Sequence, residues 1–343
     1  MGLGVDDDNT KLYICCYDPC GANPEEAYVH GDRVTICECF ARDGLQHEEA
    51  FVPTGVKIEL IEAFREAGFT RIEATSYSHP ERVPAFRDAS AVLAGLTHTD
   101  GVAYKATCPN PRAVRRALAD LDAGHGATEL SLLVSATESH TERNLGTTRE
   151  RQWDKVAEMV RLAIGRFRLV GVISVAFGCP FEGAVDPAVV AEDVARFAEL
   201  GVDLVTLGDT TGLATPKTVS AAFRRTLAAH PRLPVVAHFH NTRGTGIANC
   251  VAALEAGCRD FDTAIGGVGG HPAQIHYGGG ITGNVCTEDL VNLLESEGVS
   301  TGLDLDLLLA ASRRCEQALG RTLHSMVARA GFGLTHGEVR QDA

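Results

Sequence analysis

The order of hydrophobic and polar positions predicts short apolar strands that alternate with amphipathic helices from about residue 33 onward. The strands are expected at residues 34–40, 71–75, 102–107, 129–134, 170–176, 204–207, 235–240 and 261–265. The helices are expected near residues 54–67, 81–95, 110–123, 149–167, 187–200, 216–229, 244–257 and 287–297. Several helices begin with a proline in the first turn, such as Pro187 and Pro216, and several end at a glycine, such as Gly201 and Gly257.

Eight strand–helix units in succession predict an α/β fold in which a parallel sheet closes into a (β/α)8 TIM barrel. A doubly wound open sheet is the alternative arrangement of the same elements. No G-x-G-x-x-G motif follows the first strand, which argues against a dinucleotide-binding version of that alternative.

The two ends of the chain differ from the repeating middle. Residues 1–31 lack periodicity and are interpreted as an N-terminal extension, residues 32–302 as the catalytic barrel, and residues 303–343 as a C-terminal helical region that packs on it. The extension holds Cys15, Cys16 and Cys20, so a metal site there is an alternative, although a fourth ligand at metal spacing is not evident. The C-terminal region is expected to cover part of the barrel or to form a subunit contact, and we expect a homodimer or a higher homo-oligomer.

Composition narrows the classes of partner. The formal net charge of −14 and the pI near 5.4 argue against nonspecific binding to nucleic acid or to an anionic membrane. No apolar run is long enough to span a bilayer, and the acidic N-terminus lacks the features of a signal peptide. Eleven scattered cysteines, an odd number, fit reduced thiols. We therefore expect a cytoplasmic protein that acts on a small molecule.

Polar residues at the predicted strand ends supply a candidate metal site, because barrel active sites lie at the carboxyl ends of the strands. His238 and His240 are separated by one residue and therefore project from the same face of a strand. Together with Asp43 and Asn284 they form a mixed oxygen and nitrogen ligand set that suits Mg²⁺ or Mn²⁺, with Co²⁺ or Zn²⁺ as alternatives. Each residue alone is more often an ordinary polar residue or part of a turn, so the prediction depends on their convergence.

Three further strand-end residues are candidates for catalysis. Arg42 offers paired donors for a carboxylate or an enolate oxygen, and the alternative is a salt bridge to Glu73 or Asp209 that only holds the barrel together. Glu73 and Asp209 are candidate acid/base groups, and the alternative is that they orient a histidine or an arginine. The glycine-rich stretch between residues 266 and 283 is interpreted as a mobile loop over the site.

The strand-end motifs occur in the same order as in a known family and resemble it over residues 33–330. They are Glu38 with Arg42-Asp43-Gly44-Leu45-Gln46, Glu73-Ala74-Thr75-Ser76, Ser135-Ala136-Thr137-Glu138-Ser139 with Asn144, Gly178-Cys179-Pro180-Phe181-Glu182-Gly183, Leu207-Gly208-Asp209-Thr210, His238-Phe239-His240, and Gly283-Asn284 with Thr287-Glu288-Asp289-Leu290. This set resembles 3-hydroxy-3-methylglutaryl-CoA lyase, a member of the metal-dependent barrel superfamily of lyases and synthases.

The resemblance implies a carbon–carbon lyase of the oxo-acid-lyase type that cleaves a 3-hydroxy-acyl-CoA, or a related 3-hydroxy acid, by a retro-Claisen reaction. It also implies that Asp43, His238, His240 and Asn284 bind the divalent cation. Arg42 is implied to stabilise the enolate, and Glu73 and Asp209 to handle protons.

The chain departs from the family pattern at two positions. The lyases carry a cysteine before the proline of the glycine-rich loop, held to protonate the leaving enolate, whereas this chain reads Gly269-Gly270-His271-Pro272. His271 is therefore our candidate proton donor, with His276 as an alternative. Asn241 stands where an aspartate is usual. Two other functions stay open: an aldolase that releases pyruvate from a 4-hydroxy-2-oxo acid, and a catalytically silent metal-binding barrel that acts as a binding subunit.

Overall fold

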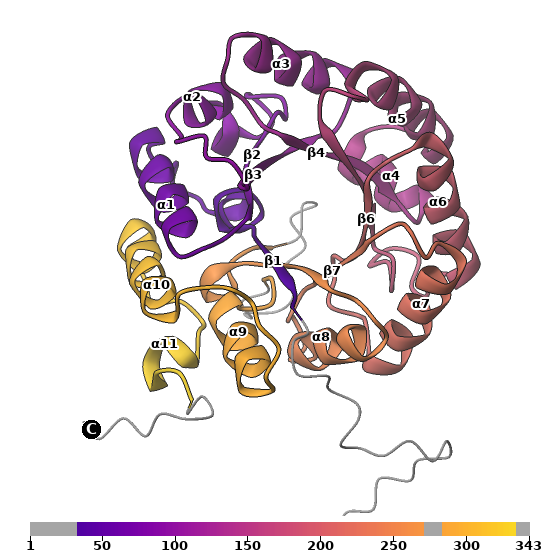
Figure 1. The fold of residues 1–343 in the computed structure, drawn as a ribbon. Helices are drawn as coiled ribbons and strands as arrows, with labels where there is room; N and C mark the ends of the chain where they lie inside the picture. Colours follow the sequence, from indigo (N-terminus) through magenta and orange to yellow (C-terminus); the bar gives the residue numbers. More distant parts are fainter. Residues whose placement is uncertain (1–32, 271–282, 334–343) are drawn as a thin grey trace, which may run out of the picture.

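The computed structural model describes residues 33–270 and 283–333, and in it eight parallel strands close into a barrel surrounded by helices (Figure 1). The strands are β1 Thr35–Glu38, β2 Arg71–Ser76, β3 Ala103–Cys108, β4 Glu129–Ser135, β5 Arg168–Ser174, β6 Leu204–Asp209, β7 Val235–Phe239 and β8 Asp260–Thr263. Each strand pairs with the next, and β1 pairs with β8 to close the ring. The predicted (β/α)8 barrel is thus confirmed.

Helices form the outer ring. They are α1 Thr54–Glu66, α2 Ala89–Ala94, α3 Pro111–Asp122, α4 Glu138–Leu145, α5 Arg149–Ala163, α6 Pro187–Leu200, α7 Pro216–Ala229, α8 Gly246–Glu255, α9 Thr287–Ser296, α10 Leu305–Leu319 and α11 Val327–Ala330. The predicted start signals work as expected: the Asp186 side chain accepts the backbone N–H of Ala188 at the start of α6.

Side chains alternate between the two faces of each strand, and this alternation separates the core from the lumen. On β4, Leu130 and Leu132 face outward into the hydrophobic core shared with the helices. Ser131 and Leu133 face the lumen and line its cavity. A small apolar cluster of Val170, Leu204 and Val236 fills another part of the barrel. The strands therefore bury their outer faces against the helices and present both polar and apolar side chains inside.

Three local predictions differ from the structure. The first strand ends at Glu38, and a π-helix at Phe40–Gly44 follows it. The helix expected at residues 81–95 is a 3-10 turn at Pro84–Phe86 followed by the short α2. Helix α4 was not expected, because its sequence Glu-Ser-His-Thr-Glu-Arg-Asn-Leu lacks a repeating apolar face.

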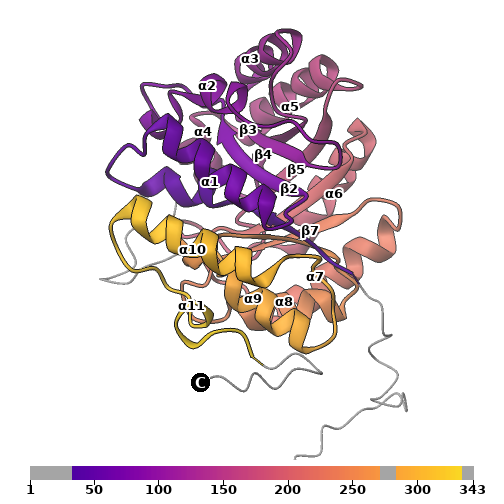
Figure 2. The same cartoon turned by 60° about the vertical axis from the view of Figure 1, so that its left-hand side comes forward.

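The C-terminal region contributes α10 and α11 to the outside of the barrel. Helix α10 packs against α1, and Figures 1 and 2 both place the two side by side. The predicted extension at residues 1–31 lies outside the described residues, and the proposed domain boundaries remain predictions. Within residues 33–270 and 283–333, no helix combines the length and the apolar content that crossing a bilayer would require.

Candidate active site at the carboxyl ends of the strands

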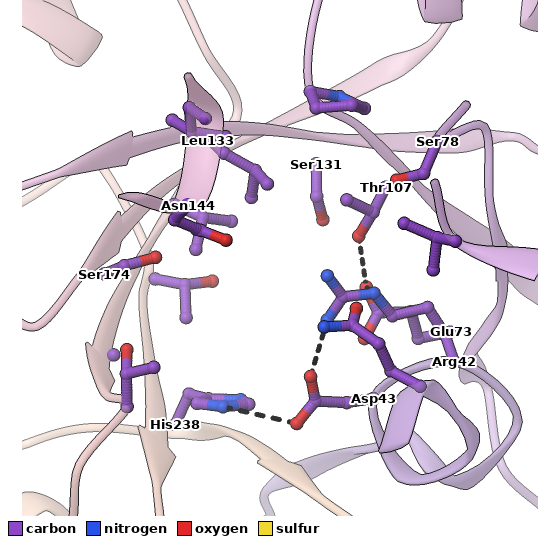
Figure 3. Close-up of a pocket in the computed structure, with 18 of the residues that line it drawn as sticks. Arg42, Asp43, Glu73, Ser78, Thr107, Ser131, Leu133, Asn144, Ser174 and His238 are labelled. Carbon is purple, nitrogen blue, oxygen red and sulfur yellow. Dashed lines mark hydrogen bonds and ion pairs between the residues drawn. The ribbon is translucent and has the colours of Figure 1, made fainter. Parts of the chain in front are cut away.

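The carboxyl ends of the strands surround a cavity of about 440 Å³ that opens into the barrel lumen (Figure 3). Five of the predicted site residues line it: Arg42, Asp43, Glu73, His238 and His240. They come from the turn after β1, from β2, and from β7 with the residue that follows it, which are far apart in sequence. Closure of the barrel brings them together, as the strand-end argument expects.

Asp43, His238 and His240 form a compact cluster. Their carboxylate oxygen and imidazole nitrogens all lie within 4.8 Å of one another. The two Nε2 atoms of the histidines are 3.3 Å apart, and Asp43 Oδ2 lies 3.6 Å from Nε2 of His240 and 4.0 Å from Nε2 of His238. One carboxylate oxygen and two imidazole nitrogens facing a common point are a donor set that fits a divalent cation.

A tight turn after β1 positions Asp43. The backbone N–H groups of Arg42, Asp43 and Gly44 all point at the carbonyl oxygen of Cys39, at 3.2, 2.8 and 3.1 Å. Gly44 is required there, because a Cβ on it would lie 2.5 Å from Cγ2 of Val268. The Asp43-Gly44 pair, which could have been an ordinary turn, thus aims a carboxylate at the cavity.

Asp43 carries a negative charge in this setting. Burial alone would raise the pKa of its carboxyl group, but the hydrogen bond with His240 and the charges of Arg42 and His238 hold that pKa well below its usual value. Arg42 donates to Asp43 Oδ1 from Nη1 over 2.7 Å. The carboxylate is therefore available as an anionic ligand.

Arg42 and Glu73 lie on the side of the cavity next to this cluster. Arg42 Nε is 3.7 Å from Glu73 Oε1, and burial, which would lower the arginine pKa, is outweighed by the carboxylates of Glu73 and Asp43, which raise it. Glu73 Oε1 accepts a 2.7 Å hydrogen bond from Thr107. Figure 3 shows Arg42, Asp43 and His238 pointing toward one another. The predicted salt bridge between Arg42 and Glu73 exists, and both groups also face the cavity.

Asn284 lies beside the cluster. Its backbone bridges to that of His240, and its Nδ2 donates to Asp43 Oδ2 over 2.8 Å and to the Val268 carbonyl over 3.0 Å. Its Oδ1 is buried and has no hydrogen-bond partner among the described residues. The preceding Gly283 is necessary, because a Cβ there would lie 1.9 Å from the carbonyl oxygen of Gly267. Rotation of the Asn284 amide would turn this unpaired oxygen toward Asp43. In that position the oxygen fits the role of a fourth ligand to a cation beside Asp43 and the two histidines.

Asp209 ends β6 at the same end of the barrel but does not line the cavity. Its two oxygens accept the backbone N–H groups of Leu213 and Ala214, over 2.8 and 3.1 Å. Burial raises its pKa, and these two hydrogen bonds oppose that rise. The carboxylate therefore holds the turn after β6, and a part in proton transfer stays a prediction.

Two lumen residues were not assigned a role from the sequence. Asp262 on β8 has its Oδ2 3.6 Å from Nδ1 of His238 and 3.2 Å from Nζ of Lys105 on β3. Lys105 Nζ also lies 3.8 Å from Glu73 Oε2. The available signal was the spacing of Asp260 and Asp262, which repeats that of His238 and His240.

Asp262 orients the imidazole ring of His238. Burial would lower the pKa of His238, but Asp262 and Asp43 raise it. Because the Nδ1 side of the ring faces Asp262, the Nε2 side is directed toward Asp43 and His240. His271 and His276, the candidate proton donors, lie outside the described residues.

Comparison with known proteins gives concordant matches. Residues 33–314 match the model of the HMGL-like family. The mitochondrial hydroxymethylglutaryl-CoA lyase of Rattus norvegicus is 39% identical over 301 residues, covering 87% of this chain and 89% of that protein. The cytoplasmic 3-hydroxy-3-methylglutaryl-CoA lyase of Mus musculus is 35% identical over 300 residues, covering 87% and 85%.

One solved structure is similar to this chain in both fold and sequence. An HMG-CoA lyase from Acinetobacter baumannii, in complex with coenzyme A and 3-methylmalate, superimposes with a TM-score of 0.82 at 37% identity. The match covers 91% of this chain and 99% of that one.

Proposed function

Because the chain belongs to the HMGL-like family, we propose that this carbon–carbon lyase cleaves 3-hydroxy-3-methylglutaryl-CoA, or a closely related 3-hydroxy-acyl-CoA, in a divalent-metal-dependent retro-Claisen reaction. The observation that carries the proposal is the convergence of Asp43, His238 and His240 within 4.8 Å, beside Arg42 at the mouth of the barrel.

Asp43, His238 and His240, with Asn284 through its unpaired Oδ1, would hold the cation. This mixed set of two oxygens and two nitrogens suits Mg²⁺ or Mn²⁺, with Co²⁺ or Zn²⁺ as alternatives. A bound cation of this kind polarises the hydroxyl and a neighbouring oxygen of the substrate, which lowers the cost of forming the alkoxide.

Arg42 and Glu73 have separate tasks in the proposed reaction. Glu73 accepts the hydroxyl proton, since it lines the cavity and Thr107 fixes its Oε1. The carbon–carbon bond then breaks, a ketone forms, and the electron pair moves to the acyl-CoA fragment as an enolate. Arg42 donates hydrogen bonds to the thioester oxygen, on which this charge develops. His271 returns a proton to the enolate carbon.

The rim of the cavity supports an anionic substrate. His79, Arg82, Arg143 and Lys155 line it, in a chain whose net charge is −14. The net negative charge of the protein does not attract an anion from a distance, but this local cluster of basic groups can bind one at the cavity. Phosphate and carboxylate groups of an acyl-CoA thioester have this character.

The test is a turnover assay on the full-length protein. Incubation with 3-hydroxy-3-methylglutaryl-CoA and Mg²⁺ or Mn²⁺ should release acetyl-CoA and acetoacetate, identified by mass spectrometry. A panel of other 3-hydroxy-acyl-CoA esters and 4-hydroxy-2-oxo acids is assayed in parallel. Release of pyruvate from an oxo acid with no cleavage of any thioester would replace the proposal by the aldolase function, and no turnover with cation still bound would leave the silent barrel.

His271 has its own test. His271→Ala should lose most turnover while it keeps its bound cation, because the substitution removes a proton donor and no proposed ligand. His276→Ala is the matched comparison in the same loop. If His271→Ala retains full activity and His276→Ala does not, then His276 is the donor.

Cytoplasmic location and a homo-oligomeric state complete the proposal. The relatives include proteins named as mitochondrial and as cytoplasmic. Fractionation of source cells and light scattering of the purified protein test these two points.

A further inference from the structure

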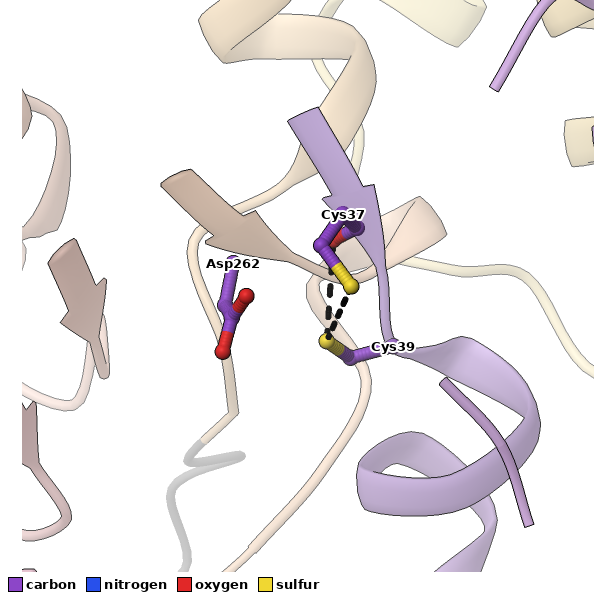
Figure 4. A group of neighbouring side chains, drawn as sticks. All are labelled: Cys37, Cys39 and Asp262. Carbon is purple, nitrogen blue, oxygen red and sulfur yellow. Dashed lines mark hydrogen bonds between the residues drawn. The ribbon is translucent and has the colours of Figure 1, made fainter. Parts of the chain in front are cut away.

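A second group of potential ligands lies inside the barrel, where β1 meets β8. Cys37 on β1 is the register partner of Asp262 on β8, and Cys39 follows two residues later on the same side. The two sulfur atoms are 4.0 Å apart, and both lie within 4.8 Å of a carboxylate oxygen of Asp262. Figure 4 shows the two thiols and the carboxylate facing the space between the two strands.

The two oxygens of Asp262 have different surroundings. Oδ2 is 3.2 Å from Lys105 Nζ and 3.6 Å from Nδ1 of His238. Oδ1 is buried and has no hydrogen-bond partner in the described part of the chain. The Asp262 side chain is only 4% exposed, so this oxygen is an anionic acceptor without a donor in a protein interior. A buried carboxylate with one unpartnered oxygen, and with an oxygen within 4.8 Å of two thiol sulfurs, points to a cation site.

We propose that Cys37, Cys39 and Asp262 form a second metal site, separate from the Asp43–His238–His240 cluster, that binds one thiophilic d10 cation of the Zn²⁺ class. Both sulfurs bind as thiolates and Oδ1 supplies the third ligand, while Oδ2 keeps its contact with Lys105. Binding exchanges the two thiol protons for the cation, and no electron is transferred.

The charges of the site balance when it is filled. Two thiolates and one carboxylate carry three negative charges, a divalent cation carries two positive charges, and the ammonium of Lys105 carries one. The sum is zero, which matters because both thiols are fully buried and an uncompensated charge there would be costly. Thiolates select Zn²⁺ and its heavier relatives over the hard cations Mg²⁺ and Mn²⁺, so the two sites discriminate by ligand chemistry.

The route to this site passes through the active-site cavity. Asp262 and Lys105 line that cavity, whereas the two cysteines are fully buried beside Asp262, at the neighbouring strand β1. A cation that enters the lumen therefore meets the carboxylate before the thiols.

The probe is Cd²⁺ alone, because cadmium thiolates absorb in the ultraviolet whereas carboxylate and imidazole complexes do not. Reduced full-length protein is titrated with Cd²⁺ in excess Mn²⁺, and bound cadmium is counted by atomic spectrometry. Cys37→Ala/Cys39→Ala should lose one bound cadmium and its absorption, whereas Cys108→Ala, which removes a buried cysteine of β3, should match the unsubstituted protein. Zn²⁺ should displace the cadmium.

Two further variants keep the result decisive. Substitution of Cys15, Cys16 and Cys20 by alanine tests the N-terminal thiols as the source of the signal. If far-UV circular dichroism shows that the double variant is unfolded, the Cd²⁺ titration is repeated on Cys39→Ala. This single variant should bind Cd²⁺ at least about tenfold more weakly than the unsubstituted protein. An unchanged cadmium count in Cys37→Ala/Cys39→Ala, or loss of the absorption only in the N-terminal variant, overturns the proposal.

Discussion

At the scale of single residues, the active site depends on which atom of each side chain faces the cavity. Asp262 orients the imidazole ring of His238, and Arg42 and the π-helix at Phe40–Gly44 orient the carboxylate of Asp43. The pattern of polar residues at strand ends identifies these two residues, but it does not predict in which direction their side chains point. The Asp262 carboxylate therefore matters to the site, although it is not a proposed ligand of the active-site cation.

Arg42 provides a sharp test at this scale. Arg42→Lys keeps a positive charge beside Asp43 but loses the paired donors, so we expect kcat to fall about 10²–10³-fold. Bound cation should be unchanged, because no proposed ligand is removed. Steady-state kinetics and atomic spectrometry on the same sample measure both. A variant with normal kcat would mean that Arg42 only holds Asp43 and Glu73 in place.

The sequence predicted five of the residues that line the cavity but gave no role to two others, Asp262 and Lys105. The His238–His240 pair, Arg42, Asp43 and Glu73 were found because strand ends in a barrel share one rim. Asp262 was not given a role, because a polar residue inside a strand faces either the lumen or the helices, and only the register of the closed barrel decides which. Lys105, the register partner of Glu73, was given no role either.

At the scale of elements, the π-helix at Phe40–Gly44 replaces the end of a predicted strand. The apolar run through Phe40 is continuous, so periodicity alone extends the strand. The backbone instead turns at Cys39, whose carbonyl oxygen accepts three successive N–H groups. This turn directs Asp43, a proposed ligand, and Arg42, a proposed cationic donor, toward the cavity.

Gly44→Ala tests the turn. The added Cβ would lie 2.5 Å from Cγ2 of buried Val268, so we expect a loss of about 1–3 kcal/mol in unfolding free energy and weaker cation binding through Asp43. Gly55→Ala in α1 is the matched control, because nothing lies within 4 Å of its Cβ, and it should be neutral or slightly stabilising. Urea unfolding and Mn²⁺ titration compare the two. Equal behaviour of both variants would show that the turn tolerates a side chain.

The contact between β1 and α9 carries a buried carboxyl group with an unusual pKa. Glu38 Oε1 accepts the backbone N–H groups of Phe40 and Ile265, and Oε2 is hydrogen-bonded to Thr287. Burial raises the pKa of Glu38 to about 8, although these hydrogen bonds oppose the rise. The group is therefore protonated at neutral pH in the folded protein.

This pKa makes stability depend on pH in a defined direction. The unfolded chain releases the Glu38 proton near pH 4.5, whereas the folded protein holds it to about pH 8, so unfolding releases a proton between these values. The free energy of unfolding should then fall as pH rises through this window, by up to about 1.4 kcal/mol per pH unit from this group. The contribution is fully present below pH 4.5 and lost above pH 8.

Glu38→Gln should remove that dependence. The amide resembles the protonated carboxyl group in shape and hydrogen bonding, so the variant should equal the unsubstituted protein at pH 4 and exceed it in stability at pH 8. Glu66→Gln, at a half-exposed position at the end of α1, is the control and should change neither value. Urea unfolding across the pH range measures the effect, and parallel curves for Glu38→Gln and the unsubstituted protein would contradict it.

At the scale of the whole molecule, the proposed cation joins segments that are far apart in sequence. Asp43 follows β1, His238 lies on β7 and His240 directly after it, and Asn284 precedes α9. The barrel closes between β8 and β1, so a cation held by these residues adds a connection across the side where the two ends of the barrel meet. Its binding energy is therefore also folding energy, since the unfolded chain does not bring these ligands together.

Removal of the cation should accordingly lower the thermal midpoint. Mg²⁺ or Mn²⁺ at a hundredfold excess over its dissociation constant should add about 2.7 kcal/mol to the free energy of unfolding, because only the folded state binds it. His240→Ala should lose most of this gain, whereas His230→Ala, at the far end of α7, should keep it. Differential scanning calorimetry with and without a chelator measures the shift. If His240→Ala is stabilised as strongly as the unsubstituted protein, the cation that stabilises the fold binds elsewhere, and the active-site cluster adds no connection between the two ends of the barrel.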